Sequence, residues 1–185
     1  MTVLKRQHYP HVGSTRSSDV VATPPAGYRG SASRALIGYG EERWEFARRE
    51  LLRWGVKTRS GFLVDGSPYP GPVVAGQLRE LTFRIFGRVV REPVEVVWVV
   101  DDERRAGFGY GTRPGHPMRG EEAFLIDIDD DGAVHVTVRS FSRPAGRWRA
   151  ITPLLRLAQR ITTRRYLRAL ATSGILGMPD RQGRG

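Results

Sequence analysis

The sequence predicts an α+β fold in which a curved antiparallel sheet grips a long C-terminal helix. Between residues 77 and 141, short segments with strand-like alternation are separated by turn residues. An amphipathic stretch then begins at Thr152, a good N-cap, followed by Pro153 at the first helical position. Since a curved sheet must cover its apolar concave face, this helix is expected to lie across it.

The composition is typical of one globular domain. The chain has 185 residues, of which 39% are hydrophobic, enough for its own core. There is no cysteine, which excludes disulfides, zinc–thiolate sites and cysteine nucleophiles. No apolar run approaches about 18 residues and no signal-peptide core is present, so we expect a cytoplasmic protein without a membrane span. We expect an extended arm over 1–33, one domain over 34–172 and a frayed basic tail over 173–185.

A strand over 33–39 and a helix over 41–54 are predicted first. Gly40 can cap this helix, and Gly55 can end it. Its apolar face repeats at helical spacing, through Trp44, Ala47, Leu51 and Trp54.

The remaining strands form a predicted meander. They cover 62–64, 78–85, 94–100, 107–112, 123–128 and 134–141. On one of them, alternation places Val94, Val96, Trp98 and Val100 on one face. Residues 129–132 (Asp-Asp-Asp-Gly) form a hairpin turn, because Asp-Gly tolerates a positive φ. Together with the terminal helix, these strands predict a helix-grip arrangement of the START or Bet v 1 type.

Positive charge is concentrated in the last quarter of the chain. The net charge is +11, and residues 139–185 hold 11 arginines but only one acid, Asp180. On the terminal helix, the apolar side is formed by Leu154, Leu155, Ala158 and Ile161. The candidate anion-binding residues are Arg156, Arg160, Arg164 and Arg168, at four-residue spacing on the other side. Since 28 of the 30 basic residues are arginine, a GC-rich genome is the competing explanation, and nucleic acid is the weaker alternative as a partner.

The densest group of candidate functional residues lies between positions 107 and 122. Alternation places Phe108, Tyr110 and Thr112 on one strand face. The opposite face carries Gly107, Gly109 and Gly111, which permit a bend or close backbone approach. A rigid Pro-Gly-His-Pro turn then holds His116 ahead of the adjacent acids Glu121 and Glu122.

Two interpretations of this segment stay open. His116 with Glu121 or Glu122 could form a general acid–base pair beside Tyr110, which makes these four the candidate catalytic residues. Alternatively, a carboxylate caps backbone amides and the histidine bonds to the backbone, so the same residues only stabilise a hairpin. The absence of a second recognisable catalytic element favours the structural interpretation.

The same segment resembles a known family. The pattern Y-G-T-x-P-G-H-P followed by G-E-E, over residues 110–122, is similar to the signature of the domain of unknown function 1990. The resemblance extends to 12–15, 25–28 and 38–40, and to 141–144 and 153–167, and so covers roughly 8–172. Met118 stands where the family often has an acidic residue, so no extra carboxylate beside His116 is implied. The family has no established activity, and its compact α+β character agrees with the prediction above.

No cofactor and no metal ligands are predicted. His8 and His11 lie three residues apart, but the intervening Tyr9-Pro10 opposes a helix that would bring them together. Asp127, Asp129, Asp130 and Asp131 resemble a calcium loop only superficially, since its glycine and closing glutamate are missing at the required offsets. The glycines at 107–111 are not followed by a helix that could hold a pyrophosphate.

Three functions follow from these observations. The first is binding of a hydrophobic small molecule in a cavity between sheet and helix, lined by Phe108, Tyr110, Thr112 and Trp98. The second is an enzyme that uses the same cavity for acid–base chemistry, as a cyclase, isomerase or hydrolase. The third is binding of nucleic acid or another anionic surface through the terminal helix. The oligomeric state is not predicted.

Overall fold

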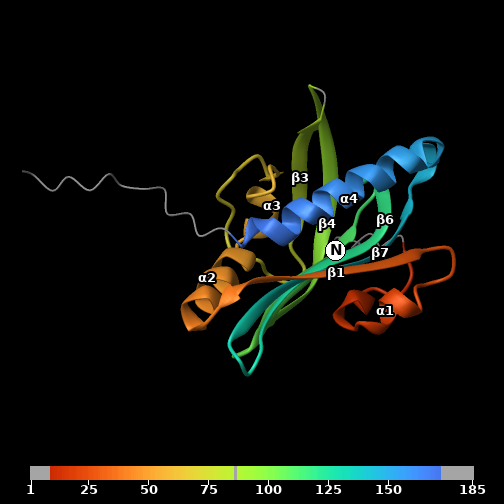
Figure 1. The fold of residues 1–185 in the computed structure, drawn as a ribbon. Coiled ribbons are helices and arrows are strands. Elements are labelled where there is room, and N and C mark those ends of the chain that lie inside the picture. The colour runs from red at the N-terminus through yellow and green to blue at the C-terminus, as the bar shows by residue number, and fades with distance from the viewer. Residues whose placement is uncertain (1–8, 86, 172–185) are drawn as a thin grey trace, which may run out of the picture.

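The fold is a seven-stranded antiparallel sheet crossed by one long helix, in a computed structural model that describes residues 9–85 and 87–171 (Figure 1). The strand order is β1-β7-β6-β5-β4-β3-β2. The strands are β1 (Arg29–Tyr39), β2 (Leu63–Val64), β3 (Leu78–Ile85), β4 (Arg88–Asp101), β5 (Arg105–Thr112), β6 (Met118–Ile128) and β7 (Ala133–Pro144). The predicted meander and the helix-grip arrangement are therefore confirmed.

The turn residues set the register of the meander. Gly132 has a φ of 81° and its amide donates to the carbonyl of Asp129, as expected for the turn between β6 and β7.

β1 begins at Arg29, earlier than predicted, and pairs with β7, the last strand in the chain. The first and last strands therefore lie side by side.

Helix α2 (Glu41–Leu51) has Gly40 as its N-cap, as predicted. The predicted stop at Gly55 is wrong, because α2 ends at Leu51 and Gly55 begins a second short helix, α3 (Gly55–Thr58). Trp54 makes the left-handed turn between the helices, with a φ of 64°. A Cβ at Gly55 would lie 2.6 Å from the carbonyl oxygen of Glu50, so glycine is needed there for close packing.

Helix α4 (Thr152–Ala169) follows the 3-10 helix η2 (Gly146–Ile151) and crosses the concave side of the sheet (Figure 1). It contacts β7, β1 and α3. Tyr166 on the helix and Leu170, which directly follows it, are fully buried and mark its packed face. The prediction that Leu154 and Ile161 form the packed side is wrong, since both are exposed.

Polar residues on the sheet beneath the first half of α4 explain why Leu154 and Ile161 are not packed against it. On β7, Val138 belongs to the main core, but the next residues on the same face are Ser140 and Ser142, opposite Glu122 and Gly120 of β6. The first half of α4 therefore meets a polar surface, where Gln159 donates to Ser142 Oγ at 3.4 Å. Burial of leucine against such a surface would gain little.

The N-terminal segment packs on the sheet, in contrast to the extended arm that the sequence predicts. After residues 1–8, which lie outside the described part, the chain forms the 3-10 helix η1 (Ser14–Arg16) and α1 (Asp19–Ala22). Tyr9, Val20 and Tyr28 pack with Phe141 in a second apolar cluster. The predicted tail over 173–185 also lies outside the described residues. Within the described ranges, no helix combines the length and apolar character needed to cross a bilayer.

Candidate functional site

Glu121 and Glu122 lie on opposite faces of the sheet. In the pairing of β5 with β6, Tyr110 opposes Glu122 and Gly111 opposes Glu121. Glu122 therefore shares the concave face with Tyr110, beneath α4, whereas Glu121 lies on the outer face, beneath the N-terminal segment. The two acids of the predicted catalytic group are not brought together.

Glu121 fixes the N-terminal segment to the sheet. Its side chain is 2% exposed. Oε1 accepts from Tyr9 OH at 3.0 Å and from the Gly13 amide at 2.5 Å. Oε2 accepts from the amide and hydroxyl of Thr15, at 3.1 and 2.8 Å. Four donors on one buried carboxylate make this a structural anchor, as the structural interpretation of the sequence proposed.

The glycine face of β5 provides the space for this segment. A Cβ at Gly111 would lie 1.8 Å from Tyr9 OH, and one at Gly109 would lie 2.3 Å from Trp98 Nε1. Trp98 Nε1 in turn donates to Thr15 Oγ1 at 3.0 Å. The predicted close backbone approach is confirmed, and the approaching group is the chain's own N-terminal segment.

On the concave face, Glu122 lies at the centre of a cluster of charged groups and hydroxyl groups. Its Oε2 accepts from Lys57 Nζ at 3.0 Å and from the hydroxyl of Tyr110. The Lys57 ammonium also donates to Tyr166 OH at 2.5 Å. Lys57 is 1% exposed, whereas the Glu122 side chain is 24% exposed. The cluster thus joins a buried cation to a carboxylate that solvent reaches.

Aromatic rings surround the Lys57 ammonium. Nζ lies 4.5 to 5.4 Å from four ring centroids, those of Phe62, Tyr110, Phe124 and Tyr166. The negative ring faces offset part of the cost of burying the cation, and Glu122 supplies the counter-charge. Burial and the charge of Glu122 raise the pKa of Tyr110 and of Tyr166 well above the usual value. Both hydroxyls therefore keep their protons at neutral pH.

Glu92 and His116 lie at the edge of this cluster. Glu92 opposes the buried Leu81 and so faces the concave side. Burial raises the pKa of Glu92 to about 7, partly offset by Lys57 and reinforced by Glu122. His116 Nε2 is 3.9 Å from Glu92 Oε2, and its Nδ1 accepts from the Met118 amide at 2.9 Å. The carboxylate that the structure places beside His116 is thus Glu92, whereas the predicted acid–base pair joined His116 to Glu121 or Glu122.

The predicted ligand-lining residues separate into two groups. Phe108 and Tyr110 are buried on the concave face, and Thr112 beside them accepts from the Gly120 amide at 3.1 Å. Trp98 lies on the outer face, so its predicted place in the pocket is wrong. A bulge between Val96 and Trp98 reverses the alternation, which sequence could not reveal because apolar residues occupy both faces of β4.

Three of the four predicted anion-binding arginines lie on the solvent side of α4. Arg160, Arg164 and Arg168 are exposed, while the side chains of Arg156 and Leu155 lie outside the described part. Among the described residues, these three arginines form no ion pair, in contrast to Arg48 and Arg113 elsewhere.

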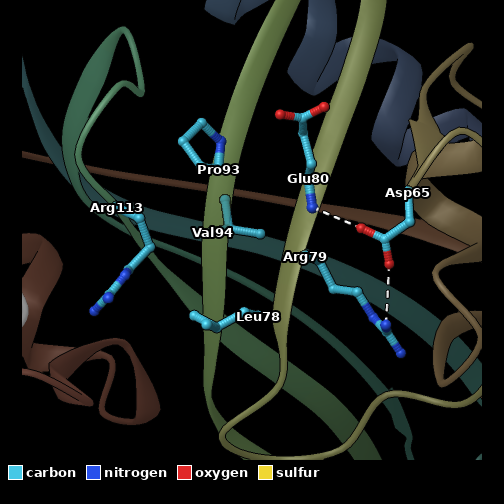
Figure 2. A pocket seen from close by; sticks show the side chains of 7 residues that line it. All are labelled: Asp65, Leu78, Arg79, Glu80, Pro93, Val94 and Arg113. Atoms are coloured by element: carbon cyan, nitrogen blue, oxygen red, sulfur yellow. Dashed lines mark hydrogen bonds and ion pairs between the residues drawn. The ribbon is translucent and has the colours of Figure 1, made fainter. Parts of the chain in front are cut away.

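Two surface hollows lie away from the cluster around Glu122 and from the arginines of α4. The first, of about 290 Å³, is formed over β3 and β4, where Asp65 binds the Arg79 side chain and the Glu80 amide (Figure 2). Its walls are Asp65, Leu78, Arg79, Glu80, Pro93, Val94 and Arg113. The second, of about 370 Å³, is formed by Glu41, Trp44, Glu45, Arg48, Asp101, Asp102 and Glu103. No residue of α4 lines either hollow.

Sequence reasoning missed Lys57, Glu92 and Tyr166. One signal for Lys57 was present, since only two of the 30 basic residues are lysines. Tyr166 lies in a segment that resembles the family pattern, but that resemblance gave it no role. Glu92 had no signal, because the groups around it come from α3, β6 and the turn after β5.

Solved structures share the fold. A hypothetical protein of Helicobacter pylori matches with a TM-score of 0.56 at 10% identity, covering 92% of this chain and 97% of that one. A protein of Thermus thermophilus matches with a TM-score of 0.52 at 18% identity, covering 77% and 94%. Ara h 8.0201, which has the Bet v 1-like fold, matches with a TM-score of 0.50 at 8% identity, covering 78% and 96%. At these identities the likeness concerns the fold alone.

Sequence relatives define the family. A UPF0548 protein of Deinococcus radiodurans is 37% identical over 152 residues, covering 77% of this chain and 76% of the relative. A UPF0548 protein of Arabidopsis thaliana is 32% identical over 120 residues, which are 61% of this chain and 57% of the relative. The family model of the domain of unknown function DUF1990 matches residues 8–169. This chain therefore belongs to the DUF1990 family.

Proposed function

We propose that this protein binds a small organic molecule between the concave face of the sheet and the first half of α4. The observation that carries the proposal is how hydrogen bonds are distributed over the two carboxylate oxygens of Glu122. Both of its hydrogen bonds within the described residues end on Oε2, from Lys57 and Tyr110. Oε1 is left to accept a hydrogen bond from a bound molecule, on a side chain that is 24% exposed.

The surroundings of Glu122 suit a ligand with an apolar body and a polar group. The aromatic core, with Phe108, Phe124 and Trp54, adjoins the cluster on one side. Ser140 and Ser142 share the concave face on the other side, opposite Glu122 and Gly120. Orienting polar groups at the edge of an apolar wall are typical of small-molecule sites. A hydroxyl or amine of the ligand would donate to Glu122, and its apolar part would pack against the rings.

Access requires movement of the first half of α4. Among the described side chains of this half, Leu154 and Leu157 face solvent and the Gln159–Ser142 bond is long, at 3.4 Å, which supports a weak attachment. The second half is held firmly by Tyr166 and Leu170 in the core. A ligand would therefore open the space by displacing the weakly packed end of the helix, which has a lower local stability.

Native mass spectrometry tests this proposal. The full chain is incubated with a small-molecule extract of its source cells, and its mass is compared under native and denaturing conditions. We expect a retained molecule on the wild type and a loss of at least tenfold in occupancy for Glu122→Gln. Glu95→Gln is the matched control, since Glu95 lies on β4 but binds Arg113 on the outer face. Absence of any retained mass, or equal retention by both variants, would refute binding at Glu122.

A second candidate function, an acid–base enzyme at the same site, is favoured by the pair Glu92 and His116. A carboxyl with a pKa of about 7 can give and take protons at neutral pH. A histidine 3.9 Å away can accept or return that proton. If this function is correct, the wild type converts the retained molecule with time, whereas Glu92→Gln retains it unchanged. A mass that stays constant on the wild type would leave binding as the sole function of the site.

A further inference from the structure

The outer face of α4 carries an apolar cluster that no part of the described chain covers. Leu154, Leu157 and Ile161 are 56%, 54% and 45% exposed. At about 100° per residue, these three lie within an arc of about 60°, on the side opposite Tyr166 and Leu170. They are therefore neighbours on one exposed face, rather than scattered single residues.

Arginines flank this apolar cluster on both sides. Arg160 and Arg164 lie along one side of the arc and Arg165 along the other, with Arg168 two turns beyond Ile161. All four are exposed and form no ion pair with the described residues. Residues 152–169 contain no acid at all. The outer face of α4 is thus apolar along its centre and strongly positive at its margins.

We propose that this face of α4 docks on an anionic lipid bilayer. The arginines would bind lipid phosphates and carboxylates, and the three apolar side chains would enter the boundary between headgroups and acyl chains. A nucleic-acid backbone would satisfy the arginines but would leave Leu154, Leu157 and Ile161 in water, so the combination favours a bilayer. The helix runs across the concave side of the sheet (Figure 1), and the apolar cluster lies on the side of the helix that faces away from the core.

Vesicle flotation of the full chain tests this docking. The probes are vesicles of phosphatidylcholine alone and vesicles with about 30% phosphatidylserine, at about 0.1 M salt. We expect binding to the anionic vesicles only, with a loss of at least tenfold in bound fraction at about 0.5 M salt. Equal binding to both vesicle types, or no binding to either, would overturn the proposal.

Two variants separate the contributions of charge and apolar contact. The triple change Arg160→Gln, Arg164→Gln, Arg168→Gln and the triple change Leu154→Ser, Leu157→Ser, Ile161→Ser should each lower anionic-vesicle binding at least tenfold. The control changes three other exposed arginines without ion pairs among the described residues: Arg49→Gln, Arg53→Gln and Arg84→Gln. It should bind like the wild type. All changed residues are exposed, and an unchanged melting temperature verifies folding.

A duplex DNA of about 20 base pairs, assayed at the same salt, distinguishes nucleic acid from a bilayer. A bilayer-docking helix should lose vesicle binding when the apolar cluster is changed to serine, whatever its residual affinity for DNA. If the serine variant keeps full vesicle binding and the wild type binds the duplex as tightly as the vesicles, the surface recognises charge alone. That result would contradict bilayer docking.

Discussion

Glu121 and Glu122 are neighbours in β6, yet one carboxylate binds the N-terminal segment on the outer face and the other binds Lys57 beneath α4. The pleat of a strand places successive side chains on opposite faces of the sheet. Two adjacent residues therefore contact different layers of the fold, the N-terminal segment on the outer face and the Lys57 cluster on the concave face. A change at either acid should therefore produce a different defect.

Glu121→Ala should release the N-terminal segment. The change removes a buried acceptor of four hydrogen bonds and leaves the donors of Tyr9, Gly13 and Thr15 without it. We expect a loss of about 3 kcal/mol in the free energy of unfolding. Hydrogen exchange should accelerate over residues 9–28, with a smaller effect at α4. An exposed acid such as Glu42 provides the control, and a Glu121→Ala protein as stable as the wild type would contradict the anchor.

Gly111→Ala should destabilise the protein through a clash with Tyr9. The added Cβ would lie 1.8 Å from Tyr9 OH, so the segment must shift, at a cost of about 2 kcal/mol. In a Tyr9→Ala background the same change meets empty space and should cost much less. A double-mutant cycle by chemical denaturation measures this coupling. Additive effects would show that Gly111 is needed for some reason other than Tyr9.

Lys57→Met should destabilise the concave site by leaving the Glu122 carboxylate without its cation. Breaking a buried ion pair from one side costs about 3 kcal/mol. Because Glu122→Gln removes the stranded charge, the double variant Lys57→Met, Glu122→Gln should recover most of this loss. Urea denaturation of the two single variants and the double variant gives the comparison. A double variant less stable than Lys57→Met would argue against the pairing of Lys57 with Glu122.

Glu92 should make stability depend on pH between about 4.5 and 7. Because its folded pKa is raised from 4.5 to about 7, the folded state holds the proton more tightly than the unfolded chain. Its stabilising effect is full below pH 4.5 and is lost as the pH rises through 7. Glu92→Gln lacks this titration. As the pH increases from about 4.5 to 7, the free energy of unfolding of Glu92→Gln relative to the wild type should therefore rise by up to about 3 kcal/mol.

Chemical denaturation of both proteins at several pH values measures this difference, and other titrating groups cancel in the comparison. A difference that stays constant from pH 4 to pH 8 would show that Glu92 titrates normally. The pH window of about 4.5 to 7 describes the free energy of unfolding and does not describe the pH dependence of a catalysed reaction.

Much of the fold could be predicted because alternation and turn chemistry determine it locally. The strands over 78–85 and 107–112, the turn ending at Gly132 and the start of α4 at Thr152 follow from such signals. The bulge at Trp98 could not be predicted, because β4 is apolar on both faces and a one-residue shift leaves no trace in the pattern.

The candidate site was predictable only in part, since its members are distant in sequence. Tyr110 and Glu122 were found because they belong to one dense segment. Lys57 comes from α3, 65 residues before Glu122, and no local pattern links the two. The same applies to Tyr9 and Glu121, 112 residues apart, whose contact turns the expected arm into part of the domain.

Binding of a ligand at Glu122 beneath α4 can be mapped by the amide chemical shifts that change on addition of the molecule retained in mass spectrometry. We expect the shifts to cluster at Tyr110, Glu122, Ser140 and Gln159, with line broadening over the first half of α4. Shifts confined to the hollow of Asp65, Leu78 and Arg113 (Figure 2), or to the N-terminal segment, would contradict it.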